Sequence, residues 1–112
     1  MTTITDDFMK QMIAAAKTYT AIILKKTPVY NREQHFPLIW EHARRNFQLR
    51  AEGKLAIVCP MRDESAVGGI GIFNLGPEET RRLMDEDPAV KAGIFTYDVH
   101  PVASFAGDAL PG

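Results

Sequence analysis

The sequence predicts an α+β fold in which four strands and two helices follow the ferredoxin-like order β-α-β-β-α-β, with one extra helix in front. Two observations lead to this prediction. Short segments rich in β-branched and aromatic residues alternate with segments whose apolar residues recur at helical spacing. Glycine or proline marks most boundaries between these segments. The 112 residues fit one core, so we expect a single domain over residues 1–112.

The segments divide into strands and helices by length and spacing. The predicted strands are residues 19–24, 54–59, 69–75 and 93–100. The predicted helices are an N-terminal extension within residues 1–17, a long helix over residues 37–53 and a shorter one over residues 76–87. Residues 101–112 include two prolines and two glycines, which predict an irregular C-terminal tail.

Capping residues mark the ends of the three helices. Thr5 is a good N-cap, and the two acidic residues after it favour a first helical turn. Pro37 suits the first position of the long helix because its missing N–H has no partner there, and Gly53 ends that helix. The last helix begins after Gly76 and should stop near Asp87, which precedes a proline.

Both faces of the predicted sheet are apolar, since the first two strands are apolar at odd and even positions alike. Two helices cover only one face, and the leading helix is too small to cover the other. We therefore expect a homodimer in which a partner's sheet covers the second face. The side chains expected in the core of that dimer are Ile22, Leu24, Ile57, Ile72 and Phe95.

Composition excludes several classes of function. A net charge of -1 gives no general attraction to nucleic acid or to anionic lipid. The longest apolar stretch, residues 55–59, is far shorter than the roughly 20 residues of a membrane span. The single cysteine, Cys59, cannot form an internal disulfide, so no oxidising compartment is needed. We expect a cytoplasmic protein with no nucleic-acid or membrane partner.

His42 and Asp87 are the candidate catalytic residues. A titratable ring among the apolar residues of the long helix is expensive to bury unless it is hydrogen-bonded, so His42 is the best candidate acid or base. The alternative is a structural histidine whose ring nitrogen meets a backbone carbonyl. Asp87 has an alternative role as well, because a carboxylate before proline commonly accepts local backbone N–H groups in a turn.

The remaining polar and glycine motifs point to no cofactor and no metal. No two His, Cys or acidic residues have a metal-binding spacing, and Cys59 has no neighbour that would activate it as a nucleophile. The glycines of residues 68–71 precede a strand and lack the last glycine of a dinucleotide fingerprint. His35 and His100 are expected at element edges, and Arg44, Arg45, Arg81 and Arg82 on solvated helix faces.

Four short segments together resemble a known family. They are His42, residues 53–55 (GKL), residues 59–60 (CP) and residues 87–93 (DPAVKAG). This order is similar to the H-to-G-[KR]-L-to-G-P and D-P-hydrophobic-V-x-A-G signatures of the YCII-related family. The resemblance implies a dimeric α+β barrel. It also implies a His–Asp pair in a cleft, which falls on His42 and Asp87 in this sequence. Cys59 stands where the family usually has glycine, and the N-terminal helix and C-terminal tail are additions.

Two functional hypotheses follow. The first is an enzyme that binds a small, aromatic or partly apolar molecule and moves a proton on it with His42 and Asp87. The reaction would be elimination or isomerisation, because the sequence has no motif for a redox cofactor. The second is a non-catalytic ligand-binding or interaction module in which the same pair only fixes helix to sheet.

Overall fold

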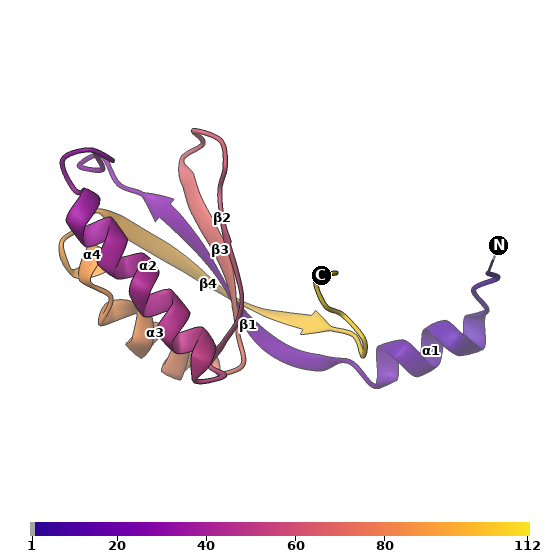
Figure 1. Cartoon of the computed structure of the whole chain (residues 1–112). Coiled ribbons are helices and arrows are strands. Elements are labelled where there is room, and N and C mark those ends of the chain that lie inside the picture. Colours follow the sequence, from indigo (N-terminus) through magenta and orange to yellow (C-terminus); the bar gives the residue numbers. More distant parts are fainter. Residues whose placement is uncertain (1) are drawn as a thin grey trace.

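A computed structural model describes residues 2–112 of the chain (Figure 1). The elements in chain order are α1 (Asp6–Ala14), β1 (Lys17–Lys26), α2 (Phe36–Ala51), β2 (Leu55–Pro60), β3 (Val67–Phe73), α3 (Pro77–Asp85), α4 (Pro88–Lys91) and β4 (Phe95–Ser104). The predicted α+β class and the predicted order of strands and long helices are confirmed.

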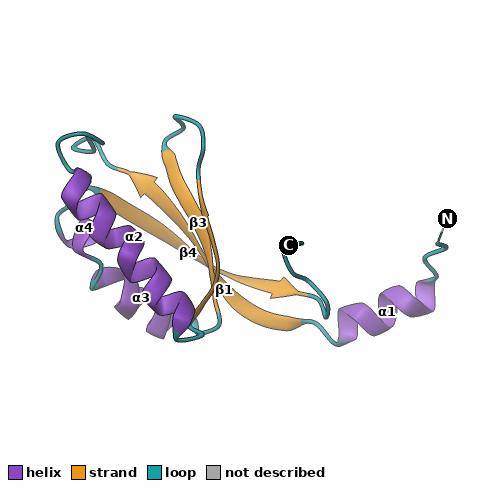
Figure 2. Ribbon diagram, in the orientation of Figure 1, coloured by secondary structure: helices purple, strands orange, loops and turns teal. Residues whose placement is uncertain are grey.

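The four strands form one antiparallel sheet in the order β2-β3-β1-β4. Helices α2, α3 and α4 lie together on one side of it, whereas α1 stands apart at the end of the ribbon that β1 and β4 form (Figure 2). Within residues 2–112 no helix is long and apolar enough to cross a membrane.

The hydrophobic core lies between the sheet and α2, α3 and α4. Its buried members are Ile22, Leu24, Leu49, Leu55, Phe73, Leu83, Met84, Ala89, Ile94 and Phe95. Strand geometry explains which residues of β1 reach the core, because Ile22 and Leu24 alternate with residues that point to the opposite face of the sheet. Ile57 and Ile72, expected in a dimer core, are only half-buried in the single chain and pair with each other across β2 and β3.

Strand β4 is longer than the sequence predicts. Residues 101–104, assigned to the irregular tail, continue the strand and pair with β1 as far as Lys17 and Ser104. Pro101 misled the prediction because proline usually interrupts a sheet. Here β4 is an edge strand, and an edge tolerates a residue that lacks an N–H donor.

Two smaller differences concern the ends of elements. The chain forms a further short helix, α4, directly after Asp87, where the prediction had the start of a connection. His100, expected at the end of a strand, lies within β4. The long helix was predicted over residues 37–53 and spans Phe36–Ala51, and Gly53 adopts a left-handed φ of 76° just after it, as a helix-terminating glycine does.

Candidate functional site

His42 and Asp87 form a buried pair. His42 lies on the face of α2 that packs toward the sheet, and Asp87 precedes α4. The imidazole Nδ1 lies 2.7 Å from Asp87 Oδ2, and the two residues are 8% and 1% exposed. The α2 and α4 helices therefore bring together the two residues that the sequence singled out.

Asp87 is held from two sides. Its Oδ1 accepts the backbone N–H groups of Ala89 and Val90, at 2.9 and 3.3 Å, so the side chain is the N-cap of α4. Burial alone would raise the pKa of Asp87, but the hydrogen bond and charge of His42, together with these two amides, outweigh burial and lower that pKa below its ordinary value. An ionised Asp87 accepts a hydrogen bond, so His42 Nδ1 carries the proton that is donated to Oδ2.

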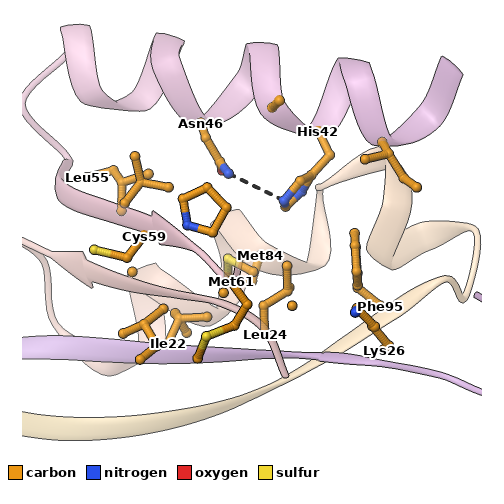
Figure 3. Close-up of a pocket in the computed structure, with 18 of the residues that line it drawn as sticks. Ile22, Leu24, Lys26, His42, Asn46, Leu55, Cys59, Met61, Met84 and Phe95 are labelled. Carbon is orange, nitrogen blue, oxygen red and sulfur yellow. Dashed lines mark hydrogen bonds between the residues drawn. The ribbon is translucent and has the colours of Figure 1, made fainter. Parts of the chain in front are cut away.

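The second ring nitrogen of His42 faces a side chain that the sequence did not identify. Asn46 lies one helical turn further along α2, and its Nδ2 is 3.3 Å from His42 Nε2 (Figure 3). An amide N–H donated to Nε2 is consistent with a lone pair on that nitrogen. The available signal was spacing, because Asn46 is a polar residue four positions after His42 on an otherwise apolar helix face.

Arg45 is a second residue whose place the sequence did not reveal. It was expected on a solvated face, but its side chain is only 21% exposed and its Nη1 lies 3.8 Å from Asp87 Oδ2. That nitrogen is buried and has no hydrogen-bond partner. The guanidinium thus adds positive charge beside the carboxylate that already accepts from His42.

A cavity of about 790 Å³ opens beside the pair, between α2 and the sheet (Figure 3). Its apolar wall includes Ile22, Leu24, Ile39, Val58, Met84 and Phe95. Its polar and charged lining includes His42, Asn46, Lys26, Arg32, Arg50 and Asp63. The volume lies within the range of small-molecule sites. A lining of many apolar groups with a few polar ones is also typical of such sites.

Two glycines leave room for this cavity. A Cβ at Gly69 would lie 3.0 Å from the carbonyl oxygen of Cys59, and one at Gly71 would lie 3.2 Å from a methyl group of Leu55. Both glycines line the cavity, so side chains there would crowd its wall. The glycines of residues 68–71 therefore relieve crowding in the sheet, as predicted.

Three other residues considered from the sequence form no hydrogen bond or ion pair with the His42–Asp87 pair. Cys59 is exposed and lines the cavity, but among the described residues it has no hydrogen bond or ion pair to an activating group. His35 and His100 do not line the cavity. Within residues 2–112, no group of three or more His, Cys, Asp or Glu side chains is arranged to hold a metal ion.

Comparison with known proteins supports the fold. No family model matches the chain, and no curated protein matches it. Among solved structures, it is similar to 5-chloro-2-hydroxyhydroquinone dehydrochlorinase from Burkholderia phenoliruptrix AC1100, in complex with 2,5-dihydroxybenzoquinone. That match has a TM-score of 0.59 and 20% identity, and it covers 73% of this chain and 90% of the other. At this identity the match shows a shared α+β fold, which agrees with the fold that the resemblance to the YCII-related family implies.

Proposed function

We propose that the protein binds a small molecule with an aromatic or partly apolar body and transfers a proton on it without a cofactor. The observation behind this proposal is that a buried, carboxylate-paired histidine lines a cavity of about 790 Å³. Buried titratable pairs in clefts are typical of acid–base sites.

In this mechanism Nε2 of His42 is the base. Asp87 fixes the proton on Nδ1, so the lone pair of Nε2 is available to remove a proton from the ligand. The imidazolium that forms is stabilised by the adjacent carboxylate. In an isomerisation the same proton returns to another ligand atom. In an elimination the electron pair of the broken C–H bond forms a double bond, and the leaving group departs with its own bonding pair.

Asn46 has a complementary task in this proposal. Its amide occupies Nε2 in the free protein, so a bound ligand must displace it from that nitrogen. The freed N–H group is then positioned to donate to an oxygen on which negative charge develops. The charged residues that line the cavity are Lys26, Arg32 and Arg50 against Asp63 and Glu64, and this small excess of positive charge favours a ligand with anionic or strongly polar oxygen substituents.

The structural neighbour supports the choice of ligand class. It is a dehydrochlorinase, and its structure contains 2,5-dihydroxybenzoquinone, a small ring with oxygen substituents. We extend to this chain only the chemical class: a compact, oxygenated ring or a partly apolar molecule of similar size.

A non-catalytic binding module is the second candidate, and one observation favours it. Asp87 caps α4 through Oδ1 and contacts His42 through Oδ2, so the pair links α2 to α4 whether or not any reaction occurs. In that case the cavity binds a ligand without changing it.

Hydrogen exchange separates the two candidates. Oxygenated aromatic and quinone compounds are first screened for binding by ligand-observed NMR, and the binders are then incubated with protein in D₂O. Catalysis predicts deuterium incorporation or product with wild-type protein and neither with His42→Asn. His35→Asn is the matched control, because His35 lies outside the cavity. Binding with no exchange or product in the wild-type protein would support the module.

We also propose that the protein is a homodimer whose interface is the uncovered sheet face. Ala21 pairs with Ile72, and Ile23 pairs with Ile70, so these apolar side chains share that face. Ile70 is 39% exposed, and no helix in the described part of the chain covers this side of the sheet (Figure 2). A second copy would remove this apolar surface from water.

A further inference from the structure

Helix α1 is held away from the rest of the chain. Strand β3 pairs with β1 only as far as Thr20, whereas β4 pairs with β1 down to Lys17. A two-stranded ribbon therefore extends beyond the sheet, and α1 stands at its tip (Figure 1). The molecule measures 53 × 30 × 24 Å, and no residue of α1 is buried.

Helix α1 has an apolar face that no other part of residues 2–112 covers. Phe8, Met9, Met12 and Ile13 lie on one side of the helix, within about 140° at 100° per residue. Phe8, Met9 and Ile13 are 48%, 48% and 60% exposed. A helix of nine residues has little stability in water without tertiary packing, so we expect another surface to cover this face.

Helix α2 has an exposed aromatic stripe, formed by Phe36, Trp40 and Phe47. These residues lie within about 40° of one another around the helix axis. Trp40 is 55% exposed and Phe47 61%, and the rings of Phe36 and Trp40 stack with their centroids 5.8 Å apart. A hollow beside Phe36 and Trp40 is lined also by Pro37 and Glu41. Three large aromatic residues on one exposed stripe are unusual unless something covers them.

The aromatic stripe and α1 cannot meet within one chain. The start of α2, which contains Phe36 and Trp40, and helix α1 lie at opposite ends of the molecule (Figure 1). Two uncovered apolar surfaces on one chain can still cover each other between two copies.

We propose that the apolar face of α1 packs on the aromatic stripe of α2 in a second copy of this chain. Charge agrees with this pairing, because the first turn of α1 contains Asp6 and Asp7 whereas the exposed charged residues of α2 are Arg44 and Arg50 against one glutamate, Glu41. The same charges disfavour an anionic lipid surface, which attracts basic amphipathic helices. The contact does not use the uncovered sheet face, but it shares Phe47 with the lining of the cavity.

Trp40 reports this contact directly, because it is the only tryptophan of the chain. In concentrated wild-type protein we expect blue-shifted emission and protection from iodide and acrylamide. Dilution should shift the emission to the red as the mass measured by light scattering falls. Phe8→Ser should give red-shifted, unprotected emission at every concentration, with an unchanged far-UV circular dichroism spectrum apart from α1. Lys10→Ser, on the polar side of α1, is the matched control and should keep the protection.

A crosslink identifies which surfaces meet. In a Cys59→Ser background, chains with Phe8→Cys are mixed with chains with Trp40→Cys and oxidised. The proposal predicts the mixed disulfide, since a disulfide requires Cα atoms within about 7 Å. Dimers of Phe8→Cys alone would mean that α1 meets α1 and would overturn it. So would a freely quenched Trp40 in concentrated wild-type protein, or protection that appears only with phosphatidylglycerol vesicles.

Discussion

The carboxylate of Asp87 accepts the imidazole N–H of His42 at 2.7 Å and the backbone N–H of Ala89 at 2.9 Å, on different oxygens. One buried side chain therefore fixes a ring tautomer and begins a helix at the same time. These two tasks separate on substitution, because an asparagine retains one oxygen acceptor but cannot be an anion.

Asp87→Asn is predicted to keep the fold and lose activity. Its Oδ1 can still cap α4, since asparagine is a good N-cap. Its amide group would face His42 Nδ1, which favours the tautomer with the proton on Nε2 and removes the base. We expect turnover of an identified substrate to fall by roughly 10² or more, the usual scale of a positioned acid or base. Steady-state kinetics measures the loss, and unchanged turnover would contradict the proposed role of Asp87.

Asp87→Ala is the companion variant and removes the cap as well. We expect it to be less stable than Asp87→Asn by about 0.5–2 kcal/mol, the usual cost of losing an N-cap. Urea unfolding of both variants gives the difference. Equal stability would mean that the bonds to Ala89 and Val90 contribute little.

The stability of the protein should depend on pH in a direction set by Asp87. Its pKa is lower in the folded state than its ordinary value of 3.8, so the unfolded chain binds more protons as pH falls toward that value. The stabilisation by Asp87 is therefore fully present above about pH 4–5 and decreases as pH falls through the folded pKa. Unfolding free energies measured between neutral and acidic pH should fall more steeply for wild-type protein than for Asp87→Asn. Parallel curves would contradict the shift.

Asn46 should affect catalysis without affecting folding. In the wild-type protein the amide nitrogen of Asn46 lies 3.3 Å from His42 Nε2. Asn46→Asp places a carboxylate there instead, which favours a proton on Nε2, the nitrogen that must be free to accept a proton from the ligand. Asn46→Ala frees Nε2 but removes the donor proposed for the ligand oxygen. We expect the aspartate variant to lose more turnover than the alanine variant. Nitrogen NMR of the ring tautomer is the second measurement, and an unprotonated Nε2 in Asn46→Asp would contradict this explanation.

The sequence predicted the order of elements because that order depends on local signals, whereas the His42–Asp87 pair was implied by the resemblance to the YCII-related signatures. Periodicity and caps define the helices, and the two signature segments place His42 and Asp87. The extent of β4 was missed because it depends on pairing with β1, which a proline at an edge does not prevent. Arg45 was missed because it faces Asp87 only once α2 packs against α4, a contact between distant segments.

With the proposed α1–α2 contact removed by Phe8→Ser, the sheet-face homodimer predicts a mass of twice 12.5 kDa in light scattering. In that background Ile23→Asp should give the monomer, because it places a charge on the uncovered sheet face next to Ile70. Ala51→Asp, at the exposed end of α2, is the control and should remain dimeric. A wild-type monomer that is insensitive to concentration would exclude this interface.

Phe95 joins the core to the candidate site, and its truncation should affect both. The ring is 6% exposed, and its centroid lies 5.2 Å from that of His42 and 5.6 Å from that of Tyr30. Phe95→Ala removes these contacts and leaves a void next to the cavity, so we expect a loss of about 3–5 kcal/mol in the free energy of unfolding. Phe105→Ala is the matched control, because Phe105 is 40% exposed and should cost far less. Urea unfolding gives both values. A loss no larger than that of the control would contradict this prediction, because it would mean that neighbouring side chains rearrange to fill the void.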